Sequence, residues 1–142
     1  MSSVEAIHAT TVASGGRALL ITGPSGSGKS DLALRLIDRG FTLVSDDQTV
    51  VTRRDDRLVA SAPATIAGKL EVRGVGIVDM QNTEGVPVAL LVELTSEIQR
   101  LPEEGRGRPI LDVPIPLISI DATTASAAAK VVIGLDRLGL RF

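Results

Sequence analysis

A glycine-rich octapeptide near the N-terminus constrains this chain more than any other feature. Its sequence is Gly-Pro-Ser-Gly-Ser-Gly-Lys-Ser, residues 23–30, a complete phosphate-binding loop. An apolar run over 17–22 precedes it and predicts a buried strand. Apolar residues at helical spacing over 31–39, followed by Gly40, predict a helix with its stop signal. Strand, glycine turn and helix in this order are what a nucleotide phosphate site requires.

The residue types of the loop explain how it would hold phosphate. Its glycines allow positive φ and leave no Cβ in the path of a phosphate. Its backbone N–H groups and the positive end of the following helix then form an anion-binding concavity. Lys29 would supply a point charge for the β and γ phosphates, and the Ser30 hydroxyl would ligate Mg²⁺. The predicted phosphate-binding residues are Gly23, Pro24, Ser25, Gly26, Ser27, Gly28, Lys29 and Ser30.

The composition argues against several other classes of protein. A net charge of −2 offers no basic field for nucleic acid or an anionic membrane, and no apolar run is long enough to span a bilayer. Without cysteine and with one histidine, His8, the sequence has no disulfide, thiolate metal site or multi-histidine zinc site. We expect one domain over residues 1–142, located in the cytoplasm, with no nucleic acid or membrane partner.

Pattern and turn signals predict more strands than helices, and therefore a strand-rich α/β domain. Glycines inside a strand-like run usually mark a bulge or a close backbone approach. The predicted elements outside the loop region are a first hairpin strand over 3–13, a strand over 41–45, a glycine-interrupted strand over 70–79, a strand over 86–94, a mobile loop over 96–109, a strand over 117–120, and a helix over 125–138 capped by Thr123 or Thr124.

Two adjacent acids, Asp46 and Asp47, follow the strand predicted over 41–45. Ligands of open α/β sheets bind at the carboxyl ends of strands, so both acids are candidates for the site. Neighbouring strand residues point to opposite faces, so one could orient metal and Lys29 while the other accepts a proton from an attacking hydroxyl. The alternative is an Asp-Asp turn between two strands.

Three further residues each have a functional and a structural interpretation. Glu71 could add a carboxylate oxygen to a Mg²⁺ shell, or be a solvated edge residue. Arg100 could fold over a γ-phosphoryl group, or be a solvated loop side chain. His8 could belong to the site, although a lone histidine on a strand usually has a structural role.

Four segments of the sequence, taken in order, resemble the catalytic domain of the HPr kinase/phosphorylase family. The resemblance rests on 23–30, on Arg39-Gly40, on 43–47 and on the block Leu-Glu-Val-Arg-Gly-Val-Gly-Ile over 70–77. It implies a P-loop kinase core related to phosphoenolpyruvate carboxykinase. It also implies that ATP and Mg²⁺ are used to phosphorylate a serine of HPr, a phosphocarrier of the bacterial sugar phosphotransferase system. Members are commonly hexameric, so a homo-oligomer is implied as well.

The resemblance assigns roles to the candidate residues. Asp47 would be the proton acceptor with Asp46 beside it, and Lys29 would hold the phosphates. The implied catalytic residues are His8, Lys29, Asp46, Asp47 and Arg100, and the implied metal ligands are Ser30 and Glu71.

The chain also departs from the family's pattern. It resembles a short form, with no N-terminal domain before Ser3 and no further helices after Phe142. The family has a Pro-Gly-Arg-Asn type segment where this chain has Asp-Ala-Thr-Thr over 121–124, and in the family that segment serves dephosphorylation by phosphorolysis. The phosphorylase activity therefore stays open.

Two other functions fit a phosphate-binding loop. A small-molecule kinase or simple NTPase would turn over without a protein acceptor. A non-catalytic nucleotide-sensing module that regulates a partner protein would bind ATP and yield no phosphoserine. Both alternatives are separated from a protein kinase by assaying phosphate transfer with and without HPr.

Overall fold

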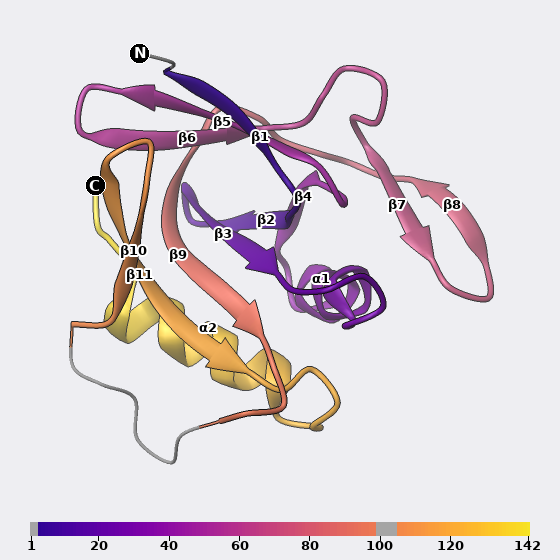
Figure 1. Cartoon of the computed structure of the whole chain (residues 1–142). Helices are drawn as coiled ribbons and strands as arrows, with labels where there is room; N and C mark the ends of the chain where they lie inside the picture. The colour runs from indigo at the N-terminus through magenta and orange to yellow at the C-terminus, as the bar shows by residue number, and fades with distance from the viewer. Residues whose placement is uncertain (1–2, 99–104) are drawn as a thin grey trace.

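In the computed structural model of the chain, residues 3–98 and 105–142 are described, and they form a nine-stranded sheet (Figure 1). Its strands are β1 (Val4–Ile7), β2 (Thr10–Ser14), β3 (Arg17–Thr22), β4 (Thr42–Ser45), β5 (Thr49–Arg54), β6 (Arg57–Ser61), β9 (Val86–Leu94), β10 (Gly107–Ile110) and β11 (Val113–Ile120). The order across the sheet is β1-β5-β6-β9-β3-β2-β4, with β11 on β9 and β10 on β11.

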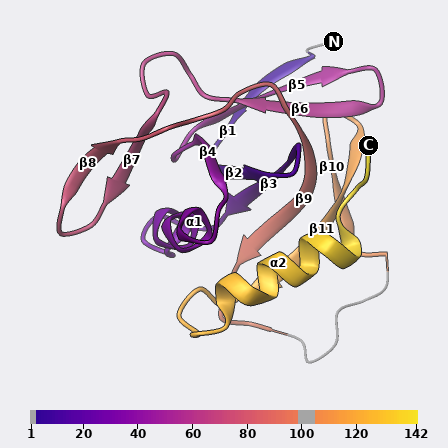
Figure 2. The same ribbon diagram turned by 180° about the vertical axis from the view of Figure 1, so that it is seen from behind.

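Two helices and a separate ribbon complete the fold. Helices α1 (Lys29–Asp38) and α2 (Ala127–Leu138) contribute to one hydrophobic cluster with β3, β9 and β11, and α2 packs on β9 and β11 (Figure 2). Strands β7 (Lys69–Val72) and β8 (Gly76–Asp79) form a two-stranded ribbon that projects from the body (Figure 1). The predicted strand-rich α/β architecture is confirmed.

The central strands are buried on both faces. Along β3, Leu19 and Ile21 belong to the cluster beneath the helices, whereas Ala18 and Leu20 belong to a second cluster on the other face. Successive strand residues point to opposite faces, and all four are fully buried, so a continuous apolar run was required here. Among the described residues, no helix is long and apolar enough to cross a bilayer.

Strand direction brings the candidate residues to one edge of the sheet. Strand β3 runs parallel to β9, and β2 runs antiparallel to both β3 and β4, so β3 and β4 point the same way. The glycine-rich loop leaves the end of β3, and Asp46 and Asp47 leave the end of β4. His8 lies just before the start of β2, at the same edge.

The single strand predicted over 3–13 is wrong. The segment forms two strands, because a turn in which the Ala9 N–H donates to Ile7 O at 3.0 Å separates them. Strand β1 then pairs with β5, and β2 pairs with β3 and β4. The predicted hairpin therefore holds only for β2 and β3.

The glycines over 70–79 do not form a bulge. Gly74 lies in the turn of the β7–β8 hairpin with a φ of 86°, and there the Val75 N–H donates to Val72 O at 2.9 Å; Gly76 begins β8 opposite Val72. A glycine signals positive φ, and here that conformation reverses the chain.

Three late boundaries also differ from the prediction. Strand β10 begins at Gly107, inside the region predicted as a loop over 96–109, and β11 begins at Val113 rather than 117. Helix α2 begins after Ser126, so neither Thr123 nor Thr124 is its N-cap residue.

Candidate active site

The glycine-rich loop over 23–30 has the backbone that the sequence predicts. Gly28 is the N-cap residue of α1 with a φ of 99°, a conformation that a Cβ would disfavour. Gly23 allows a close approach, because a Cβ there would lie 2.7 Å from Ser27 Oγ and 3.1 Å from Leu94 Cβ. The loop is therefore packed at its base and leads directly into the positive end of α1.

Lys29 is folded back onto this loop. The residue is 7% exposed, and Nζ donates to Gly23 O at 3.0 Å and Pro24 O at 3.2 Å. Both acceptors are neutral carbonyl oxygens. An incoming phosphate would be a stronger acceptor for the same ammonium, because it adds a negative charge opposite the positive one.

Asp46 is the buried centre of the site. Its Oδ1 accepts from Ser30 Oγ at 2.6 Å and from Thr10 Oγ1 at 3.1 Å. Its Oδ2 accepts from the Glu71 backbone N–H at 3.0 Å. One carboxylate thus joins the start of α1, the start of β2 and the β7–β8 ribbon.

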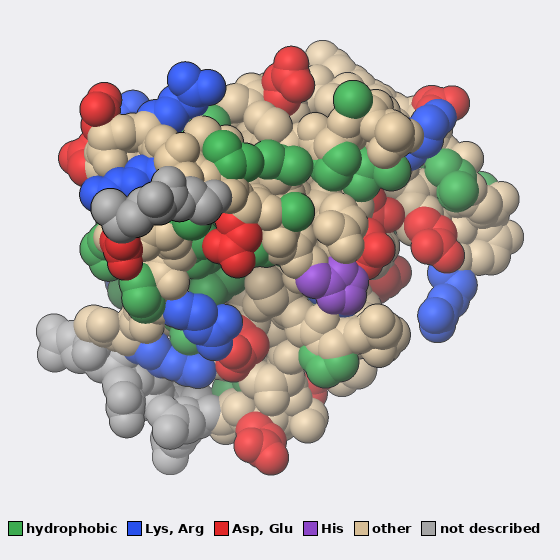
Figure 3. Space-filling model, turned by 45° about the horizontal axis from the view of Figure 1, so that its top comes forward, with side chains coloured by type: hydrophobic (Ala, Val, Ile, Leu, Met, Phe, Trp, Pro, Cys, Tyr) green, Lys and Arg blue, Asp and Glu red, His purple; other side chains and the backbone are tan. Residues whose placement is uncertain are grey.

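Asp47 points the other way, as expected for adjacent residues. Its side chain is 65% exposed, and Oδ1 lies 2.6 Å from His8 Nε2. An ionised carboxylate can only accept, so the proton of this bond lies on Nε2 whenever Asp47 is charged. The Asp47 N–H donates to Thr10 Oγ1 at 3.1 Å, and φ is 67°, a left-handed value that aspartate tolerates. Figure 3 views this face, with acidic side chains beside the histidine.

The loop, the aspartates and the ribbon enclose one cavity of about 480 Å³. A volume of this size lies within the range of ligand sites, about 300–1,000 Å³. It is lined by Ser25, Gly26, Gly28, Lys29, Ser30, Asp31, Leu34, Asp46, Asp47, Glu71, Val72 and Arg73.

The same arrangement of segments occurs in known proteins. Residues 1–134 match the family described as HPr Serine kinase C-terminal domain. This chain belongs to that family. The recognition of an HPr kinase/phosphorylase domain from the sequence is therefore confirmed.

Relatives and a solved structure agree with this assignment. The chain is 36% identical over 141 residues to an HPr kinase/phosphorylase of Lactiplantibacillus plantarum and 34% identical over 141 residues to one of Levilactobacillus brevis. Each match covers 90% of this chain and 45% of the relative, so the chain spans about half the length of these relatives. The structure of the Hpr(Ser) kinase/phosphatase from Coxiella burnetii matches with a TM-score of 0.79 and 27% identity, covering 94% of this chain and 97% of that one.

Most residues that the sequence singles out meet at this site. The cavity is lined by Lys29, Ser30, Asp46, Asp47 and Glu71. His8 does not line the cavity but is hydrogen-bonded to Asp47, which does. Arg100 lies outside the described residues.

Sequence reasoning missed two residues that organise this kinase-family site. Thr10 is fully buried and bonds to both aspartates, but a threonine at the start of a strand carries no special signal. Arg35 on α1 donates to Ala122 O at 2.6 Å and to Thr124 O at 3.4 Å, and its Nε lies 3.2 Å from Asp31 Oδ2. Its guanidinium therefore holds the turn that follows β11 against α1.

The oxygen atoms at the cavity suit a magnesium ion that arrives with a nucleotide. Mg²⁺ prefers oxygen ligands and usually takes one or two carboxylates together with phosphate oxygens. Ser30 Oγ, Asp46 and Glu71 offer such oxygens in one place. Among residues 3–98 and 105–142 no group of three or more acidic or histidine side chains forms a metal cage, and a magnesium ion held partly by phosphates needs none.

Proposed function

We propose that this chain is a protein serine kinase that uses ATP and Mg²⁺ to phosphorylate an HPr-like phosphocarrier. We further propose that its 142 residues form one domain with a P-loop kinase core of the phosphoenolpyruvate carboxykinase type. Family membership and the names of the relatives support the substrate and the reaction.

One observation carries the proposal: two adjacent aspartates beside the glycine-rich loop have separate environments. Asp46 is buried and bonded to Ser30, whereas Asp47 is exposed at the cavity wall and bonded to His8. Phosphoryl transfer needs one carboxylate on the metal side and one near the nucleophile. A simple phosphate-binding protein has no use for the second carboxylate.

The loop would bind the ATP phosphates. Its backbone N–H groups and the N-terminus of α1 favour negative charge, and Lys29 would exchange its two carbonyl acceptors for phosphate oxygens. Ser30, Glu71 and Asp46 would hold the magnesium ion, which when bound neutralises charge on the transferred group.

Asp47 would act as the general base. The serine hydroxyl of the carrier would attack the γ-phosphorus, its proton would pass to the Asp47 carboxylate, and the bond to the oxygen bridging the β and γ phosphorus atoms would break to release ADP. His8 already occupies Oδ1 of Asp47, so Oδ2 would be left to receive the proton. His8 and Thr10 would act as positioning residues for that carboxylate.

Mass spectrometry of a purified HPr-like carrier, incubated with the chain, Mg²⁺ and ATP, tests this function. We expect a single phosphoserine with the wild-type chain and none with Lys29→Met. Lys69→Met is the matched control, because Lys69 lies outside the cavity in an exposed pair with Asp79 and should leave the product unchanged.

Two outcomes would contradict the proposal. ATP binding without phosphoserine on any carrier would favour the nucleotide-sensing module. ATP turnover with a small acceptor and no need for the carrier would favour a small-molecule kinase.

Three further expectations stay predictions. Phosphorolytic dephosphorylation is tested by pyrophosphate release from seryl-phosphorylated carrier and inorganic phosphate. A homo-oligomer, implied by the family resemblance, is tested by light scattering coupled to size-exclusion chromatography. A cytoplasmic location fits the absence of cysteine and is tested by cell fractionation.

A further inference from the structure

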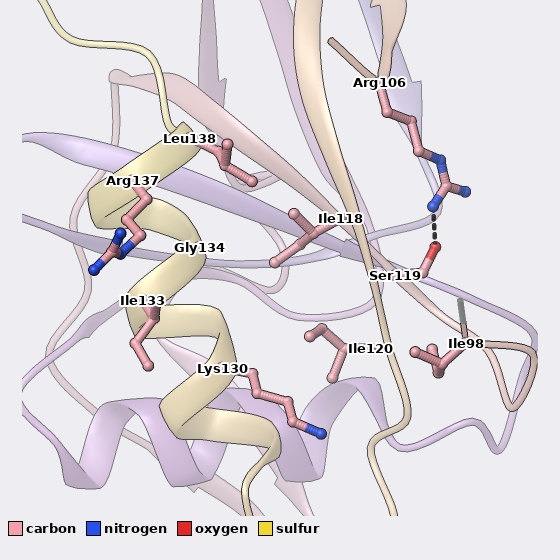
Figure 4. Close-up of a pocket in the computed structure, with 10 residues that line it drawn as sticks. All are labelled: Ile98, Arg106, Ile118, Ser119, Ile120, Lys130, Ile133, Gly134, Arg137 and Leu138. Atoms are coloured by element: carbon pink, nitrogen blue, oxygen red, sulfur yellow. Dashed lines mark hydrogen bonds between the residues drawn. The ribbon is translucent and has the colours of Figure 1, made fainter. Parts of the chain in front are cut away.

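A second hollow lies between the outer side of α2 and the edge of β11 (Figure 4). We call it the α2 groove. Its volume is about 350 Å³, and it shares no lining residue with the candidate active site. It is lined by Ile98, Arg106, Ile118, Ser119, Ile120, Lys130, Ile133, Gly134, Arg137 and Leu138.

Helix α2 is apolar on two sides. One side, with Ala127, Val131 and Leu135, is buried in the core. Another side of α2 lines the groove and is formed by Lys130, Ile133, Gly134, Arg137 and Leu138. The last four follow Lys130 by three, four, seven and eight residues, a spacing that places all five on one stripe of the helix.

The apolar residues of that stripe face solvent. Ile133 is 55% exposed and Leu138 is 51% exposed, and Ile98 across the groove is also exposed. Single exposed hydrophobic residues are ordinary, but a group that lines one hollow is typical of a binding surface.

The ionisable side chains that line the groove are all of one sign. Its three ionisable lining residues, Arg106, Lys130 and Arg137, are basic. Arg106 is held by Ser119 at 2.7 Å and lies 3.6 Å from Glu93. Within the described part of the chain Lys130 and Arg137 form no ion pair, although the charge of Lys130 also reaches Asp121.

This charge pattern selects the kind of occupant. A second copy packed face to face through the groove would place Lys130 and Arg137 opposite the same cations, which is unfavourable. A partner with carboxylates would be attracted. Lys130 and Arg137 are seven residues apart, about 10 Å along the axis at 1.5 Å per residue, so carboxylates seven residues apart on a partner helix match them.

We propose that the α2 groove docks an acidic amphipathic helix of a partner protein. The helix carries carboxylates at positions i and i+7, which meet Lys130 and Arg137, and apolar residues at i+3 and i+4, which cover Ile133 and Gly134 between them. Docking of an amphipathic helix through i, i+3, i+4 and i+7 anchors is a common recognition mode.

A designed peptide tests this docking. The probe is a helical peptide with glutamate at i and i+7 and leucine at i+3 and i+4, and its control has lysine in place of glutamate. NMR spectra of the ¹⁵N-labelled chain should show shifts at Ile98, 118–120 and 130–138 with the glutamate peptide only.

Charge reversal provides the decisive comparison. Lys130→Glu combined with Arg137→Glu should weaken the glutamate peptide at least about tenfold, because two attractive contacts become repulsive. The reversed variant should instead bind the lysine peptide. Arg141→Glu is the matched control, because Arg141 is an exposed cation just beyond α2 that does not line the groove. Ile133→Asn should lose the glutamate peptide and retain the wild-type melting temperature.

Three results would overturn the proposal. The wild-type chain could fail to bind the glutamate peptide, or the reversed variant could bind it as tightly as the wild type. Sedimentation could also reveal a dimer of the chain that Ile133→Asn abolishes, which would assign the groove to a second copy.

Discussion

Replacement of Asp46 by asparagine should reduce the stability of this protein and weaken the proposed magnesium site, whereas the same replacement at Asp47 should reduce turnover without a comparable loss of stability. The two side chains are adjacent and chemically identical. They differ in that Asp46 is 9% exposed and accepts three hydrogen bonds, whereas the Asp47 carboxylate is largely exposed and contacts His8.

The expected loss at Asp46 follows from its contacts. An asparagine can keep its oxygen toward Ser30 and Thr10, but its NH₂ group would then face the Glu71 N–H, so one bond to a charged acceptor is lost. Such a bond contributes about 1.5–3 kcal/mol. For a protein of this size that loss lowers the melting temperature by about 3–10 °C.

The expected loss at Asp47 is chemical. Asparagine tolerates the left-handed backbone at φ 67° as aspartate does, and the exposed pair with His8 contributes at most about 1 kcal/mol. A missing general base lowers kcat by about 10²–10⁴-fold. The affinity for ATP should stay unchanged, because the phosphates are held by the loop and Lys29.

Differential scanning calorimetry without nucleotide and single-turnover phosphorylation of the carrier measure the two effects separately. If Asp46→Asn melted like the wild type while Asp47→Asn melted several degrees lower, our division between a buried organiser and an exposed base would be wrong. Near-normal turnover by Asp47→Asn would exclude this residue as the base.

Two other substitutions test single contacts. Glu71→Gln should raise the concentration of free Mg²⁺ needed for half-maximal activity several-fold at unchanged melting temperature, measured by titrating Mg²⁺ at fixed ATP; an unaltered requirement would remove Glu71 from the metal site. Thr123 donates from its hydroxyl and its backbone N–H to Asp121, and these bonds lower the pKa of that carboxyl. Thr123→Val should therefore move the pKa of Asp121 upward toward its ordinary value, as followed by NMR titration, and a pKa that stayed or fell would contradict this cause.

The loop and its flanking elements could be predicted because their signals are local. The apolar run over 17–22, the glycines and the helical spacing over 31–39 all describe neighbouring residues, and β3 and α1 form there. The pairing of β1 with β5 could not be predicted in the same way. It depends on contacts between residues more than forty positions apart, such as Val4 with Thr52, that leave no local pattern.

In the candidate site, too, features with a local sequence signal could be predicted, and features that depend on distant strand pairing could not. The opposite directions of Asp46 and Asp47 agree with the prediction from strand alternation, but both residues lie in the turn after β4, and the left-handed φ of 67° at Asp47 belongs to that turn. Thr10 could not be found, since its importance comes from the sheet pairing that places it beside both acids. The glycines at 74 and 76 indicated positive φ, but a bulge and a hairpin both use that conformation, and the pairing of β7 with β8 decides between them.

The contacts of Arg35 couple α1 to the turn between β11 and α2, two segments far apart in the sequence. Because one side chain binds Asp31 and the carbonyls of Ala122 and Thr124, neither α1 nor the turn that leads into α2 can shift without stretching the same set of contacts. A lysine has a single nitrogen and lacks the planar fork that lets Arg35 use three separate nitrogens for Asp31, Ala122 and Thr124. A displacement of the C-terminal helix that moves this turn would therefore strain the contacts of Arg35. Because Arg35 belongs to α1, the strain would reach the loop before α1 that would hold the nucleotide.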